Sequence, residues 1–258
     1  MSFLNKIEGP SDLKKLTPQE LPQLCEEIRQ QIIAVIANIG GHLASNLGVV
    51  ELTVALHYLL NTPEDLIVWD TSNQAYTHKL LTGRREQFHT IRQFGGMSGF
   101  CKREESSYDT FNAGHAGTGV SAAVGFMEAR EQKKQSHKIV CVVGDGALTS
   151  GLTLEGLQQA GDLSKDLLVI LNDNQMSISK NVGAISAYLN RTITGEFYSK
   201  LKQMKVPDSK HFHDAISQMP KARFTQKCLP ACTKQLLHEL LEGGKKVAES
   251  GEDDFESN

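Results

Sequence analysis

Two short apolar runs, each followed by a polar turn, mark the middle of the chain. Residues 139–143 lead into Gly144-Asp145-Gly146, and residues 167–171 lead into Asn172-Asp173-Asn174. Short apolar runs bounded by glycine and polar residues are typical of buried strands, and the stretch between them is long enough for a helix. This order predicts a parallel β-α-β unit. Both strands then finish at the same edge of the sheet, where open α/β sheets bind ligands.

Other parts of the chain carry weaker signals of the same kind. Residues 66–69 predict a third strand, which ends at Asp70. Apolar residues at helical spacing between Leu24 and Ile36 predict a helix, which Thr17-Pro18-Gln19-Glu20 should cap as a capping box. We expect further helical pieces over residues 46–60, 78–81 and 120–130, and a glycine- and charge-rich excursion over the surface at residues 95–108.

The helical and strand periodicity weakens after Met204. We therefore expect a first domain over residues 1–203 and a divergent helical extension over residues 204–258. Its acidic end, residues 251–258, has the composition of a disordered tail.

The composition is that of an ordinary soluble α/β protein. Of the 258 residues, 40% are hydrophobic and 22% are charged, and the net charge of −3 gives no sign of a nucleic-acid surface. The chain lacks an apolar run of the ~18 residues that a membrane span needs, and its first residues do not resemble a signal peptide. We expect a cytoplasmic protein.

Five cysteines at irregular spacing are consistent with a reducing compartment. Cys228 and Cys232 could join His211 or His213 in a metal site, but neither a CxxC pair nor a helical HxxxH pair supports one.

The polar residues that follow the strands at residues 139–143 and 167–171 predict a magnesium-diphosphate site. The Asp145 carboxylate and the Asn174 side-chain amide are hard oxygen ligands, which suit Mg²⁺ and leave other positions to phosphate and water. Gly144 and Gly146 allow the backbone to approach a phosphate closely. A helix that starts after Gly146 would point its N-terminus at the same place and favour an anion.

Five motifs resemble those of the 1-deoxy-D-xylulose-5-phosphate synthase family, a transketolase-like family that uses thiamine diphosphate. In chain order they read GGHLASNLGVVELTVALHYLLNTPED, WDTSNQAYTHKLLTGRREQFHTIRQ, FNAGHAGTGVSAA, GDGALTSGLTLEGL and LNDNQMSISKNVGA. The resemblance covers roughly residues 25 to 200. It implies the thiamine diphosphate-binding fold: α/β, with a doubly wound, mostly parallel sheet and helices on both faces.

The resemblance also implies an activity. Family members condense pyruvate with D-glyceraldehyde 3-phosphate, lose CO₂, and serve isoprenoid precursor, thiamine and pyridoxal synthesis. Thiamine diphosphate and Mg²⁺ are the cofactors, and the family dimerises. The resemblance implies the following site residues: His42 for proton transfer; Asp145, Asn174 and the Met176 carbonyl for Mg²⁺; and Asn73, Gly114, His115, Ala116, Gly146, Ala147 and Asn174 for the cofactor. A neutral His115 is expected to donate a hydrogen bond to a diphosphate oxygen.

The chain departs from the family pattern in two ways. Where the family has a cofactor-contacting histidine, this chain has Asn73, which can hydrogen-bond but cannot exchange protons near pH 7. The two further domains of the family, with the glutamate that activates the aminopyrimidine, have no counterpart here. Activity would therefore need a partner that carries them.

Two alternatives remain open. The chain could be a non-catalytic paralogue that keeps the fold as a binding or regulatory protein, or the N-terminal subunit of a split transketolase. The exposed apolar surface of a lone domain predicts a homodimer or a partner protein.

Overall fold

The structure, a computed structural model, describes residues 2–172 and 223–227. The described elements, in chain order, are η1 (Leu4–Lys6), α1 (Pro10–Leu13), α2 (Leu21–Ile39), α3 (Leu43–Leu47), α4 (Val50–Leu59), β1 (Leu66–Trp69), α5 (Tyr76–Leu81), η2 (Phe88–Thr90), α6 (Gly119–Gln132), β2 (Ile139–Gly144), α7 (Asp145–Leu148), α8 (Gly151–Leu163), β3 (Leu168–Asn172) and β4 (Arg223–Lys227). The expected boundary at residue 203 and the expected acidic tail lie outside the described residues.

The described strands form one parallel sheet in the order β1-β2-β3-β4. The three predicted strands are confirmed to within one residue at each end. The fourth, β4, lies in the extension for which we expected helices, and it pairs parallel to β3.

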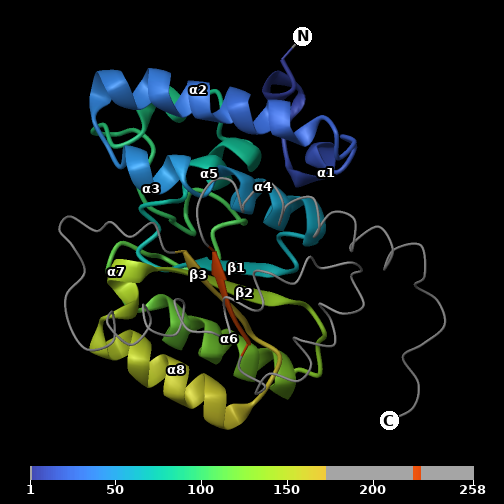
Figure 1. The fold of residues 1–258 in the computed structure, drawn as a ribbon, viewed down its shortest axis with the longest axis vertical. Coiled ribbons are helices and arrows are strands. Elements are labelled where there is room, and N and C mark those ends of the chain that lie inside the picture. The colour runs from blue at the N-terminus through green and yellow to red at the C-terminus, as the bar shows by residue number, and fades with distance from the viewer. Residues whose placement is uncertain (1, 173–222, 228–258) are drawn as a thin grey trace, which may run out of the picture.

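Helices cover both faces of the sheet (Figure 1). On one face, α6 and α8 pack against alternate strand residues such as Val68, Cys141 and Val169. On the other face, Leu52 and Leu56 of α4 meet the intervening strand residues. Strand side chains alternate between faces, so each face receives its own apolar set. The expected α/β architecture is confirmed. The described strands keep sequence order across the sheet, so they do not show the reversal of strand order that double winding requires.

A separate apolar core holds the N-terminal helices together. The buried stripe of α2, with Leu24, Ile28 and Ile32 fully buried, packs against α4 and α5. This confirms the predicted periodicity, but α2 begins at Leu21 and not at Pro18. The Glu20 carboxylate accepts hydrogen bonds from the Thr17 backbone N–H and hydroxyl, which closes a turn before the helix.

Two other expectations need correction. The helix expected over residues 46–60 is split into α3 and α4, with a break at Gly48 and Val49. Residues 95–108 do not simply cross the surface, because Met97 and Cys101 are buried. The apolar pattern of the sequence did not predict the helix break, and the glycine and charge content of residues 95–108 did not predict that some of them are buried.

None of the helices in the described ranges has the length and apolar character needed to span a bilayer.

Candidate functional site

Asp70, at the carboxyl end of β1, binds the backbone of the loop that contains the predicted cofactor residues Gly114, His115 and Ala116. Its Oδ1 accepts a hydrogen bond from the Gly117 N–H at 2.8 Å, and its Oδ2 accepts one from the Gly119 N–H at 3.2 Å. Burial raises the pKa of Asp70 despite these two donors. A Cβ on Gly119 would lie 2.8 Å from the Asp70 Cβ. The start of α6 therefore needs glycine in order to approach β1 this closely.

The same loop is fixed on its other side by the start of α8. Gly117 has a φ of +90°, and a Cβ there would lie 1.9 Å from the Ser150 Oγ. The Ser150 Oγ accepts a hydrogen bond from the Thr153 N–H and so caps α8. The Thr153 hydroxyl donates to the Ala147 carbonyl oxygen at 2.7 Å. The loop that holds Gly114, His115 and Ala116 is thus connected through contacts to Ala147, another predicted cofactor residue.

The predicted magnesium ligand Asp145 lies at the end of β2, where it begins α7 and is half-buried. Gly144 is paired in register with Asn172 of β3, so the two strands finish side by side as predicted. Asn174 and Met176 lie outside the described residues. The expected helix after Gly146 is one turn only, α7, which contains Gly146 and Ala147. The longer α8 begins at Gly151, so its N-terminus is not directly beside Gly146.

His115 is exposed, and its ring nitrogen Nδ1 lies 2.9 Å from the Ala116 carbonyl oxygen. A carbonyl only accepts, so Nδ1 carries the proton, and a neutral ring then has a bare Nε2. The donation of a hydrogen bond by neutral His115 to a diphosphate oxygen stays a prediction, and it needs a ring orientation other than the one seen here. Only a protonated ring could donate from Nε2 while it keeps this bond.

His42 is half-buried at the start of α3 and faces two side chains from a distant segment. Arg92 Nη1 lies 3.2 Å from His42 Nδ1, and because arginine only donates, Nδ1 accepts and the proton of a neutral ring is on Nε2. The Phe100 ring lies beside the imidazole, with 6.0 Å between ring centroids. Burial, and then the Arg92 charge, lower the pKa of His42. The side chain is thus kept neutral, with Nε2 as a hydrogen-bond donor.

Asn46 joins the loop of His42 to the loop of Asn73. It is fully buried, and its Nδ2 donates to the carbonyl oxygens of His42 (2.6 Å) and Asn73 (2.7 Å). Its Oδ1 accepts from the Tyr76 N–H at 2.8 Å. Sequence reasoning did not identify Asn46. The available signal was a polar pair, Ser45-Asn46, before Leu47 and Gly48, which is equally typical of a solvated turn.

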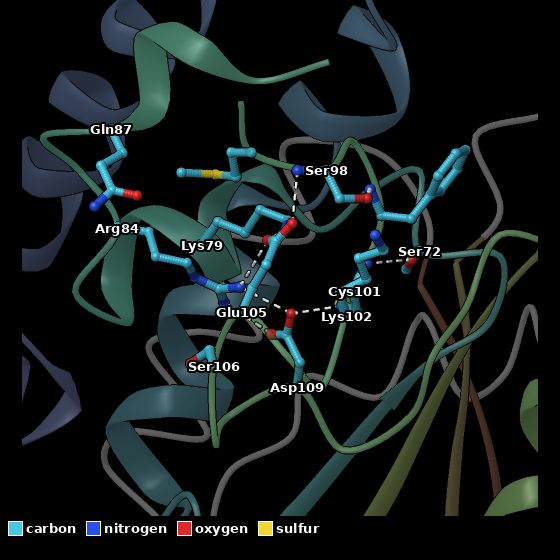
Figure 2. Close-up of polar contacts among 12 residues, drawn as sticks. Ser72, Lys79, Arg84, Gln87, Ser98, Cys101, Lys102, Glu105, Ser106 and Asp109 are labelled. Carbon is cyan, nitrogen blue, oxygen red and sulfur yellow. Dashed lines mark hydrogen bonds and ion pairs between the residues drawn. The ribbon is translucent and has the colours of Figure 1, made fainter. Parts of the chain in front are cut away.

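A buried network of charged groups lies behind these loops (Figure 2). Arg84 makes a bidentate pair with Asp109, with both N–O distances 2.8 Å, and Lys79 binds Glu105 at 2.6 Å. Burial raises the pKa of Asp109, but the hydrogen bonds from His78 and Arg84 outweigh it and hold the pKa of that carboxyl well below its usual range. The network ties α5 to residues 98–109, the stretch that we expected on the surface.

His78 continues this network to His57. His78 Nε2 lies 2.9 Å from the ionised Asp109 carboxylate and so donates, while its Nδ1 lies 2.8 Å from His57 Nε2. Burial lowers the pKa of both histidines and keeps them neutral. His57 Nε2 therefore donates to His78, and His57 Nδ1 accepts from the Thr62 hydroxyl at 3.1 Å. One directed chain of hydrogen bonds runs from Thr62 to Asp109.

His78, Cys101 and Asp109 come close enough together to suggest a metal site. The chemistry argues against one. Both His78 nitrogens and both Asp109 oxygens already have partners. Burial also raises the pKa of the Cys101 thiol to about 12, so the thiol is protonated in the metal-free protein.

The described residues at the end of β2 fit a magnesium-diphosphate group. Asp145 would supply a hard oxygen ligand there. A Cβ on Gly144 would meet no atom within 4 Å in the described part of the chain, so the backbone is open beside Asp145. Gly114 has a φ of +139°, a conformation that residues with a side chain rarely adopt.

The chain is similar to known synthases in sequence. The family profile described as 1-deoxy-D-xylulose-5-phosphate synthase matches residues 4–242. The 1-deoxy-D-xylulose-5-phosphate synthase of Syntrophomonas wolfei is 58% identical over 201 residues, which are 78% of this chain and 32% of the relative. The synthase 1 of Geobacter sulfurreducens is 54% identical over 202 residues, with the same coverage. The chain thus spans about a third of the length of these relatives.

Among solved structures, a transketolase from Pichia stipitis in complex with xylulose-5-phosphate superposes with a TM-score of 0.60. The match covers 90% of this chain and 45% of the transketolase at 16% identity, and it shows the shared fold. The sequence match decides the family. The chain belongs to the 1-deoxy-D-xylulose-5-phosphate synthase family and corresponds to the N-terminal part of its members.

Proposed function

We propose that this chain supplies the magnesium-diphosphate side of a thiamine diphosphate site, as the N-terminal part of a 1-deoxy-D-xylulose-5-phosphate synthase. The observation that carries the proposal is the β2 end, where Asp145 follows a strand paired with β3 and is linked through Ala147, Thr153 and Ser150 to the Gly117 loop. The substrates would be pyruvate and D-glyceraldehyde 3-phosphate, and the reaction would run in the cytoplasm.

Each predicted residue has a role in this proposal. Asp145, the Asn174 side chain and the Met176 carbonyl would hold Mg²⁺. Gly114, His115, Ala116, Gly146 and Ala147 would line the diphosphate, with Asn73 beside it. Neutral His42 would donate a hydrogen bond from Nε2 to a substrate oxygen, because Arg92 occupies Nδ1. The bound cofactor would supply the electron sink for the loss of CO₂.

The curated relatives are about three times as long as the part that matches. We propose that a homodimer or a partner protein that carries the remaining two thirds completes the site.

The direct test is calorimetric titration with thiamine diphosphate in the presence and absence of Mg²⁺. We expect micromolar binding that needs Mg²⁺ and that Asp145→Ala abolishes, while Asp162→Ala, an exposed aspartate on α8, binds as the native chain does. Binding that is unchanged by chelation of Mg²⁺, or by Asp145→Ala, would contradict the proposal.

Asn73 favours a second candidate, a non-catalytic paralogue that keeps the fold and the diphosphate site. The family's cofactor-contacting histidine is absent at this position. The variant Asn73→His separates the two candidates when the rest of the synthase is supplied. If the native chain supports no turnover and Asn73→His restores turnover, the chain is the non-catalytic paralogue. Turnover by the native chain excludes that candidate.

A further inference from the structure

Phe100 lies between two residues of the candidate site that are far apart in the sequence. Its ring packs beside the His42 imidazole at a tilt of 52°. On its other side, a Cβ added to Gly114 would lie 3.8 Å from the Phe100 ring atoms Cδ2 and Cγ. The ring therefore contacts the predicted proton donor and fits against the predicted cofactor loop.

Hydrogen bonds fix the backbone on both sides of Phe100. Its own N–H donates to the Ser98 hydroxyl at 3.1 Å, and the Cys101 N–H donates to the Ser72 hydroxyl at 2.9 Å. The Cys101 carbonyl accepts from the Ala113 N–H at 3.3 Å. Phe100 is thereby attached to the loop after β1 and to the residue before Gly114.

The buried charged network anchors the same segment. The Ser98 N–H donates to Glu105, which also binds the fully buried Lys79. The Lys102 N–H donates to Asp109 at 2.8 Å (Figure 2). Burying ionised groups is costly unless each of them is paired, so a segment held in this way is fixed in one position. Side chains of functional sites are held accurately by such supporting contacts.

We propose that Phe100 is a positioning residue of the candidate site: it orients the His42 ring and shields it from water. This inference rests on the proposed function. With Arg92 on Nδ1 and Phe100 beside the ring, His42 is held with Nε2 as its free donor. Among the described residues, the Arg92 guanidinium and the Phe100 ring face the His42 imidazole, and the Tyr76 hydroxyl accepts a hydrogen bond from the His42 backbone N–H. Removal of the Phe100 ring exposes the imidazole to water while it leaves Arg92 and Tyr76 in place.

The test is an NMR titration of His42 in the protein without ligand. We expect Phe100→Ala to raise the pKa of His42 toward its ordinary value of 6.5, since burial is the main cause of its depression. Phe100→Tyr keeps the aromatic ring and should leave the pKa depressed. Phe94→Ala is the matched control, because Phe94 is fully exposed six residues earlier in the chain, and it should change nothing.

A His42 pKa that is the same in the native chain and in folded Phe100→Ala would overturn the inference. If Phe100→Ala does not fold, Phe100→Val serves instead: it keeps an apolar side chain but removes most of the ring that covers the imidazole, and an unchanged His42 pKa in that variant would also overturn the inference. The readout needs no cofactor, so it is separate from the proposed function. Failure of the native chain to bind thiamine diphosphate with Mg²⁺ would reject that function and leave the His42 titration interpretable.

When the remaining two thirds of the synthase are supplied, a second readout follows. The acidic limb of the activity profile should move to higher pH in Phe100→Ala, and Phe100→Tyr should restore it. A purely structural role would lower activity equally at every pH and would not move this limb.

Discussion

At the scale of single residues, Asn46 carries the strongest prediction. Its side chain satisfies the carbonyl oxygens of His42 and Asn73 and the N–H of Tyr76 in a site that excludes water. Asn46→Ala leaves all three groups without this partner. Because each buried group without a partner costs roughly 1–3 kcal/mol and some relaxation occurs, we expect a loss of about 2–4 kcal/mol in the free energy of unfolding, measured in urea.

The control for Asn46 is Asn38→Ala. Asn38 makes one side-chain hydrogen bond, to the Ala34 carbonyl oxygen, on the exposed face of α2. Its loss should change stability by less than about 0.5 kcal/mol. If the two variants lose equal stability, Asn46 does not hold the two loops together.

At the scale of elements, the close packing of α8 on α6 depends on Gly156. A Cβ there would lie 2.8 Å from the Ser121 Oγ and 3.1 Å from the Val120 Cγ1. We expect Gly156→Ala to destabilise the protein by about 1–3 kcal/mol because the helices must move apart, although alanine is the better helix former.

Gly161 offers a matched comparison on the same helix. A Cβ at this position meets no atom within 4 Å among the described residues. Gly161→Ala should therefore stabilise the protein by about 0.5–1 kcal/mol through helix propensity alone. Thermal unfolding of both variants checks the pair, and a shift of the same sign in both would show that α8 does not pack tightly through Gly156.

The histidine pair that links α4 to α5 predicts how stability depends on pH. Burial lowers the folded-state pKa of His57 and of His78, so the unfolded chain binds more protons once the pH falls below about 6.5. The free energy of unfolding should then decrease as the pH falls, by up to about 1.4 kcal/mol per pH unit for each histidine, until the folded pKa is reached. Urea unfolding between pH 7 and pH 5 measures this slope.

His57→Gln removes one of the two histidines of this pair and should reduce that slope. His89→Gln alters an exposed histidine on η2 and should leave the slope unchanged. A slope that stays the same in His57→Gln would mean that His57 is not the source of the acid sensitivity.

The elements also show what the sequence can and cannot predict. The strands were predictable because short apolar runs with polar ends have few other interpretations, and the strand ends located Asp145 and Asp70 in the same way. The buried network was not predictable. Charged residues such as Lys79 and Asp109 are normally solvated, and only the folded chain brings these two segments together. The same limit explains why Asn46 and Phe100 were missed.

At the scale of the whole molecule, the candidate site lies where two packed units meet. His42 lies at the start of α3 in the N-terminal helical part and Asn73 lies in the loop that joins β1 to α5, whereas Asp145 and Ala147 follow strand β2 of the sheet. The loop around Gly114 contacts both units, through Phe100 on one side and through Ser150 on the other. A change in how the units pack would therefore alter the site even where no site residue is replaced.

The last prediction concerns completion of the enzyme in trans. The chain matches about a third of the Syntrophomonas wolfei synthase, so the remaining two thirds of that relative can be supplied as a separate protein. We expect CO₂ release from pyruvate, in the presence of D-glyceraldehyde 3-phosphate, thiamine diphosphate and Mg²⁺, only when both proteins are present. Asp145→Ala in this chain should remove the activity because the magnesium ligand is lost, while Asp162→Ala should keep it. Activity of the supplied protein alone, or activity that survives Asp145→Ala, would show that the β2 end does not hold the cofactor.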